Sequence, residues 1–141
     1  MFLEENTIPT SFQPVADVLR IDAAKEVDRI ANAVRDLVLT QFKRKGAVVG
    51  VSGGIDSSVV AALCTYALGK DRVIALFMPE TESAADNLVL GRMLTESLGI
   101  AAVTEDITSI LEGAGFYRRR DEAIRSVVPE YGEGYKCKIT L

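Results

Sequence analysis

The stretch AVVGVSGGIDSSVVAALCTYALG, residues 47–69, places a glycine- and serine-rich loop between two apolar segments. Residues 47–51 are wholly apolar, which is typical of a central strand covered on both faces of a parallel sheet. Residues 57–68 carry apolar side chains at helical spacing, and Gly69 is a natural stop. The order strand, loop, helix predicts one unit of an α/β fold.

The segment before this stretch, residues 22–45, has the periodicity of an amphipathic helix. Asp22 is expected to cap its N-terminus and Gly46 to end it. The basic residues 43–45 are interpreted as a solvated helix end, where the helix dipole favours cations. Residues 1–21 contain two prolines and no sustained period, so we expect an extended arm.

Two more strands are expected at residues 72–78 and 100–107, joined by a helix over 83–98. Ser83 and Asp86 have the spacing of a capping box at the start of that helix. Strands that alternate with helices predict a doubly wound parallel sheet with helices on both faces. The inward face of the helix is expected to comprise Leu90, Met93, Leu94 and Leu98.

Composition excludes several kinds of function. The 141 residues suit one domain, and a net charge of −4 argues against binding nucleic acid through bulk charge. The chain has no histidine, which excludes Ser-His-Asp and Cys-His catalysis and His-ligated metals. Cys64 and Cys137 form no C-x-x-C pair, and free thiols favour the cytoplasm. The acidic N-terminus and the lack of a long apolar run predict neither a signal peptide nor a membrane span.

The loop from Ser52 to Ser58 has the properties of an anion site. It leaves a parallel strand and enters a helix N-terminus, where ligands bind in open α/β sheets and where unpaired N–H groups attract phosphate. Gly53 and Gly54 permit positive φ and close approach of the backbone to an oxyanion. The loop contains no lysine and its glycines are adjacent, so it matches neither the Walker A loop nor the dinucleotide fingerprint.

Asp56 is the informative residue of this loop, because a carboxylate in an anion site repels phosphate unless a cation lies between them. Mg²⁺ prefers one or two carboxylates together with phosphate oxygens and water. Asp56 is therefore interpreted as a magnesium ligand facing a polyphosphate. The alternative is that Asp56 merely caps the following helix.

The sequence VGVSGGIDSSVVAAL, residues 49–63, resembles the N-type ATP pyrophosphatases, whose signature is Ser-Gly-Gly-x-Asp-Ser. Within this group it looks most like the NAD synthetases, which often carry a pair such as Met78-Pro79 after the second strand. The resemblance covers residues 22–113 and implies an adenine nucleotide alpha hydrolase-like fold, with residues 114–141 as a poorly matched polar tail. NAD synthetases are longer than this chain and carry a second metal-binding acid later in the sequence, so the chain is expected to be incomplete.

The resemblance implies a ligase that adenylates the carboxylate of deamido-NAD with ATP and releases pyrophosphate, after which ammonia displaces AMP to give NAD. It implies ATP and Mg²⁺ as cofactors and a cytoplasmic homodimer without membrane or nucleic-acid partners. Asp56 would hold Mg²⁺, and no catalytic residue is assigned. The ATP-binding residues so implied are Gly50, Val51, Ser52, Gly53, Gly54, Ile55, Asp56, Ser57, Ser58, Phe77 and Met78.

Two other functions fit the same residues. A GMP-synthetase-like or tRNA-modifying ligase would keep the ATP chemistry and change the acceptor; sulfur-transferring relatives often use a catalytic cysteine, but neither Cys64 nor Cys137 is well placed for that role. A non-catalytic ATP-binding module would bind nucleotide without releasing pyrophosphate. The arginine run at residues 118–120 is interpreted as a solvated helix face, with phosphate contact as the alternative.

Overall fold

Three parallel strands form the centre of the molecule, whose computed structural model describes residues 20–132, 134 and 135. In sheet order they are β1 (Ala47–Gly50), β2 (Val73–Phe77) and β3 (Ala101–Thr104). Each strand pairs in parallel with its neighbour in the sheet. The predicted parallel α/β architecture is confirmed, and each strand is shorter than the predicted segment because the terminal residues belong to the connecting loops.

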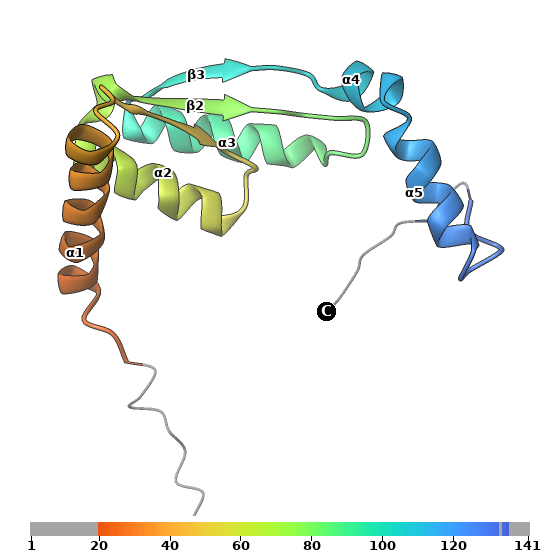
Figure 1. The fold of residues 1–141 in the computed structure, drawn as a ribbon, viewed down its shortest axis with the longest axis horizontal. Helices are drawn as coiled ribbons and strands as arrows, with labels where there is room; N and C mark the ends of the chain where they lie inside the picture. The colour runs from red at the N-terminus through yellow and green to blue at the C-terminus, as the bar shows by residue number, and fades with distance from the viewer. Residues whose placement is uncertain (1–19, 133, 136–141) are drawn as a thin grey trace, which may run out of the picture.

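The helices α2 (Ile55–Leu68) and α3 (Ala85–Leu98) connect the strands and lie on one side of the sheet (Figure 1). The helix α1 (Ala23–Arg35) packs against α2 through buried Ala31. Asp22 caps α1 as predicted, because its carboxylate accepts from the backbone N–H of Lys25 at 3.2 Å.

The end of the first helical segment differs from the prediction. A π-helical turn (Asp36–Gln41) follows α1, and helical structure ends at Gln41 instead of Lys45. Lys43 then adopts a positive φ of 50°. Gly46 therefore does not end the helix. It is needed because a Cβ there would collide with the carbonyl group of Arg72, beside which β1 begins.

The start and the buried face of α3 also differ from the prediction. Ala84 occupies the N-cap position without a side-chain cap, so the expected capping box of Ser83 and Asp86 is wrong. Leu90 and Met93 are at least half exposed, whereas Leu94 and Leu98 pack against the core as predicted. The helix is rotated because Gly91 is buried against the ring of Phe77, where an added Cβ would lie 2.6 Å from Cε1.

The two faces of the sheet differ in burial. Side chains of β1 and β2 that face the helices are buried, namely Val49, Val73, Ala75 and Phe77. On the opposite face Val48 is 66% exposed, and Ile74 and Val103 are close to half exposed. Within the described residues, α2 and α3 thus cover one face only, and β1 lies at the edge of the sheet, not at its centre as predicted.

The part of the chain after β3 forms two further helices, α4 (Thr108–Gly113) and α5 (Phe116–Arg125). The predicted polar helix around residues 118–125 is confirmed as α5, which extends away from the sheet (Figure 1). A short 3₁₀ turn (Lys70–Arg72) precedes β2. No helix among the described residues combines the length and hydrophobicity needed to cross a membrane. The predicted N-terminal arm up to residue 19, and Cys137, lie outside the described residues.

Candidate functional site

The loop between β1 and α2 lies at the carboxyl edge of the sheet. The N–H of Val51 donates to the carbonyl of Leu76 at 3.0 Å and so continues the pairing of β1 with β2. Gly53 then has a φ of +81°. A Cβ on Gly53 would collide with the backbone oxygen of Asn87 and lie 2.8 Å from its Cα. Only glycine therefore allows the loop to lie directly against the first turn of α3.

Hydrogen bonds among its own residues hold this loop in shape. The N–H of Ser52 donates to the hydroxyl of Ser57 at 3.2 Å, and the two hydroxyl oxygens are 3.1 Å apart. The hydroxyls of Ser57 and Ser58 donate to the carbonyl of Gly54 at 3.1 and 2.8 Å. The loop is thus ordered by its own side chains, and a ligand would meet a preformed surface.

Asp56 lies exposed in the first turn of α2, two residues after the N-cap. Gly54 is the N-cap, with φ −86° and ψ 166°, and no side chain caps the helix. The alternative interpretation of Asp56 as the helix cap is therefore wrong. In the part of the chain that the structure describes, no three His, Cys, Asp or Glu side chains form a metal-binding group. A cation at Asp56 would thus depend on oxygens of a bound ligand, which is how Mg²⁺ joins carboxylates to phosphates.

A cavity of about 380 Å³ opens beside this loop, between the end of β2 and the start of α3. Phe77 is almost fully buried, whereas Met78 is about half exposed and so offers most side-chain surface. Of the eleven ATP-binding residues expected from the sequence, Val51, Ser52, Phe77 and Met78 line the cavity. The other seven belong to β1, the loop and the first turn of α2. The lining residues are Val51, Ser52, Phe77, Met78, Pro79, Glu80, Ser83, Ala84, Asn87 and Leu88.

The sequence did not identify the turn that follows β2 and the first residues of α3 as part of the site. Their position follows from topology, because in a parallel sheet the segment after β2 emerges at the same edge as the loop after β1. The collision that a Cβ on Gly53 would make with Asn87 fixes this adjacency. The sequence signal that could have found it was the acidic, polar run PETES, residues 79–83, directly after a buried strand.

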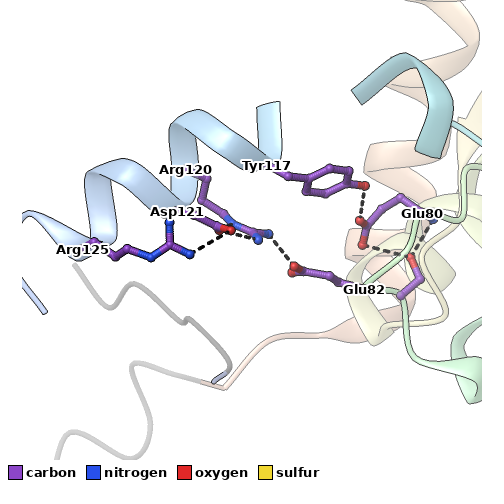
Figure 2. Close-up of polar contacts among 7 residues, drawn as sticks. Glu80, Glu82, Tyr117, Arg120, Asp121 and Arg125 are labelled. Carbon is purple, nitrogen blue, oxygen red and sulfur yellow. Dashed lines mark hydrogen bonds and ion pairs between the residues drawn. The ribbon is translucent and has the colours of Figure 1, made fainter. Parts of the chain in front are cut away.

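Glu80 and Glu82 in this turn are bound by side chains of α5 (Figure 2). The hydroxyl of Tyr117 donates to Glu80 Oε2 at 2.7 Å, and Arg120 Nη1 lies 2.7 Å from Glu82 Oε1. The hydrogen bond to Glu80 raises the pKa of Tyr117. Arg120 also donates to Asp121, which is the main reason that its pKa is raised. Glu80, which lines the cavity, and Glu82, which follows it in the turn, therefore both already have partners.

The other arginines of the 118–120 run also have partners, one within α5 and one at the end of α4. Arg118 forms an ion pair with Glu122 at 3.1 Å, and Arg119 donates to the carbonyl of Ala114 at 2.6 Å. The interpretation of the run as a solvated helix face holds for Arg118 and Arg119, which are exposed. Arg120 is partly buried and pairs with the turn after β2.

Cys64 does not belong to this site. It is buried in the core, as predicted, and burial raises the pKa of its thiol. A buried thiol with a raised pKa is a poor nucleophile. Cys64 is therefore a core residue in α2.

The parallel sheet and the glycine-serine loop at its carboxyl edge define an α/β protein with an adenine nucleotide alpha hydrolase-like fold. The sequence profile of the NAD synthase family matches residues 26–127. An NH₃-dependent NAD⁺ synthetase of Mesorhizobium japonicum is 56% identical over 124 residues, which are 88% of this chain and 39% of the relative. The chain belongs to the NAD synthase family.

Solved structures agree with this assignment. An NH₃-dependent NAD synthetase from Campylobacter jejuni, solved with a nitrate ion, matches with a TM-score of 0.62 and 33% identity over 70% of this chain and 42% of that one. A glutamine-dependent NAD⁺ synthetase from Acinetobacter baumannii, solved with ADP, has a TM-score of 0.64 at 22% identity over 81% of this chain and 20% of that one, which shows the fold alone. The chain spans about two fifths of the length of its curated relative from Mesorhizobium.

Proposed function

We propose that the chain supplies the ATP-binding part of a ligase that makes NAD from deamido-NAD and ammonia. The observation that carries the proposal is the preformed segment from Ser52 to Ser58, which leads into the first turn of α2 beside the cavity. The phosphates would lie on the loop, where backbone N–H groups and the dipole of α2 favour anions. Met78 and the buried end of β2 would flank the adenine.

Mg²⁺ fits this arrangement through Asp56. The carboxylate is exposed at the start of α2 and has no capping role. When bound, the ion supplies neutralisation of the phosphate charge. Asp56 would orient it from the protein side, and the hydroxyls of the loop stay bonded to one another and keep the loop in place.

The acceptor follows from the family. The carboxylate oxygen of deamido-NAD would attack the α-phosphorus of ATP and expel pyrophosphate, and ammonia would then displace AMP from the acyl-adenylate. The absence of histidine is compatible with this reaction, because positioning and charge neutralisation supply most of the rate enhancement in such transfers. A GMP-synthetase-like or tRNA acceptor is not favoured, since the curated relatives are named as NAD synthetases.

A second copy of the chain and a cytoplasmic location complete the proposal. Apolar side chains of α2 and α3 that the sheet does not cover, Val59, Val60, Leu90 and Met93, are about half exposed and offer a surface for a homodimer. Sedimentation equilibrium would measure the association. A purely monomeric species at all concentrations would contradict the homodimer.

The test of the function uses a chimera. The chain replaces the matching 124 residues of the Mesorhizobium relative, with which it is 56% identical. The chimera is expected to form NAD from ATP, deamido-NAD and ammonia, with one pyrophosphate released per NAD, and to form no product from XMP. A matched chimera with Asp56→Asn controls for background activity. A folded chimera that binds ATP and releases no pyrophosphate with any acceptor would favour the non-catalytic module.

A further inference from the structure

The turn from Glu80 to Ser83 forms one wall of the cavity and leads directly into α3. It is closed by its own hydrogen bonds: the N–H of Ser83 donates to the carbonyl of Glu80 at 2.9 Å, and the N–H of Glu80 donates to the hydroxyl of Ser83 at 3.0 Å. Two residues after α3 begins, Asn87 lies against Gly53 of the loop. A displacement of this turn would therefore reach the loop through the first turn of α3.

The turn also carries two carboxylates, whose negative charge would repel an anion bound in the cavity. Glu80 lines the cavity, and Glu82 lies two residues further along the same turn. A free carboxylate near bound phosphates costs binding free energy, because like charges repel more strongly at a partly buried site than in water. Contacts that orient these carboxylates away from the cavity would therefore favour the binding of an anion.

The helix α5 provides both contacts (Figure 2). Tyr117 donates to Glu80 at 2.7 Å, and Arg120 pairs with Glu82 at 2.7 Å. Arg120 is itself fixed, since it donates to Asp121 at 2.9 and 2.7 Å and its guanidinium carbon lies 5.3 Å from the centre of the Tyr117 ring. The two contacts thus form one unit on one face of α5.

We propose that α5 acts as a clamp on the nucleotide site, in which Tyr117 and Arg120 are positioning residues that hold Glu80 and Glu82 away from the phosphates and fix the turn that forms the cavity wall. The inference rests on the proposed ATP site and adds residues to it that do not touch the nucleotide. If this is correct, loss of the clamp weakens the binding of a highly charged ligand such as ATP more than the binding of an uncharged one.

The test compares ATP, ADP and adenosine on the 141-residue chain by titration calorimetry. Tyr117→Phe keeps the ring and removes the donor to Glu80. It is expected to raise the Kd for ATP about fivefold, which corresponds to about 1 kcal/mol, the Kd for ADP less, and the Kd for adenosine by less than twofold. Adding Glu80→Gln to Tyr117→Phe removes the charge and is expected to restore the affinity for ATP.

The matched control is Tyr66→Phe. The hydroxyl of Tyr66 also donates to a carboxylate, that of Asp28, at 3.0 Å. Tyr66 lies near the C-terminal end of α2, eleven residues after Ile55, so it is about 16 Å along the helix from the loop. Its loss is expected to leave ATP affinity unchanged. Arg120→Gln should bind ATP more weakly, whereas Arg120→Gln combined with Glu82→Gln, which also removes the carboxylate left unpaired, should bind ATP like the unaltered chain.

The outcomes separate the clamp from the ATP site. If the unaltered chain binds no ATP, the proposed ATP site is refuted, and the clamp, which rests on it, is refuted as well. If it binds ATP and Tyr117→Phe leaves the Kd unchanged, or raises it equally for ATP and adenosine, the clamp is refuted while the ATP site stands. If adding Glu82→Gln to Arg120→Gln does not restore ATP affinity, the pairing of Arg120 with Glu82 is refuted as part of the clamp.

Discussion

Replacing Gly53 by alanine is expected to destabilise the fold more than the same replacement at any other glycine with a similar backbone. Gly53 has a φ of +81°, and an added Cβ would collide with the backbone of Asn87. The positive φ costs about 1–2 kcal/mol for alanine. The backbone shift that relieves the collision adds about 1–3 kcal/mol, so the free energy of unfolding is expected to fall by about 2–5 kcal/mol.

Two control replacements separate these contributions. Gly99 ends α3 with a φ of +65°, but its Cβ would meet only Lys70 Cδ at an ordinary 3.6 Å, so Gly99→Ala measures the backbone strain alone. Gly113 has neither a positive φ nor an atom within 4 Å of an added Cβ. Gly113→Ala therefore reports the loss of unfolded-state entropy, which stabilises a protein by about 0.4–1 kcal/mol.

The assay is urea denaturation of the three variants and the unaltered chain, followed by circular dichroism. The expected order of stability is Gly113→Ala highest, then Gly99→Ala, then Gly53→Ala. The close approach of the loop to α3 would be refuted if Gly53→Ala and Gly99→Ala lowered the free energy of unfolding by amounts that agree within about 0.5 kcal/mol, the usual spread for a surface change. The arrangement of the cavity beside the loop would then be wrong as well.

Three further predictions concern the site and the core. Gly54→Val, whose Cβ would lie 3.4 Å from Ser52 Oγ in an extended backbone, should stay folded and lose ATP binding in calorimetry; unchanged affinity would place the site elsewhere. Asp56→Asn should raise the Kd for Mg·ATP at least tenfold while the thermal midpoint stays within about 2 °C, because Asp56 is not the cap; the reverse pattern would contradict its role as a metal ligand. In a Cys137→Ser background, iodoacetamide should label Cys64 only after unfolding, and rapid labelling of the folded chain would contradict the burial. Because burial raises the pKa of Cys64 in the folded state, the free energy of unfolding should be constant below the pKa of the unfolded thiol and fall as the pH rises above it.

The sequence predicted the elements that depend on local patterns. The apolar run before Ser52, the loop and the periodic segment after it were enough to predict β1, α2 and the position of the loop at the carboxyl edge. Asp22 as a cap and Gly69 as a stop were also predictable, because both act on backbone groups within a few residues of themselves. The family signature lies within this same local stretch.

What the sequence could not decide depends on contacts between segments far apart in the chain. Periodicity alone did not reveal the rotation of α3, because Gly91 has no side chain and becomes an inward position only where the ring of Phe77 meets it. Periodicity also did not reveal that β1 lies at the edge of the three-stranded sheet, because an edge strand and a central strand can have the same apolar sequence.

The polar wall of the cavity shows the same division. Tyr117 and Arg120 lie more than thirty residues after Glu80 and Glu82, and in the sequence both pairs look like ordinary surface residues. The sequence by itself determined the βα unit, its glycine-serine loop and the family, because short-range backbone and side-chain chemistry encodes them. Only the tertiary structure decided what faces that loop, because the turn after β2, the start of α3 and the side chains of α5 come together only once the chain has folded.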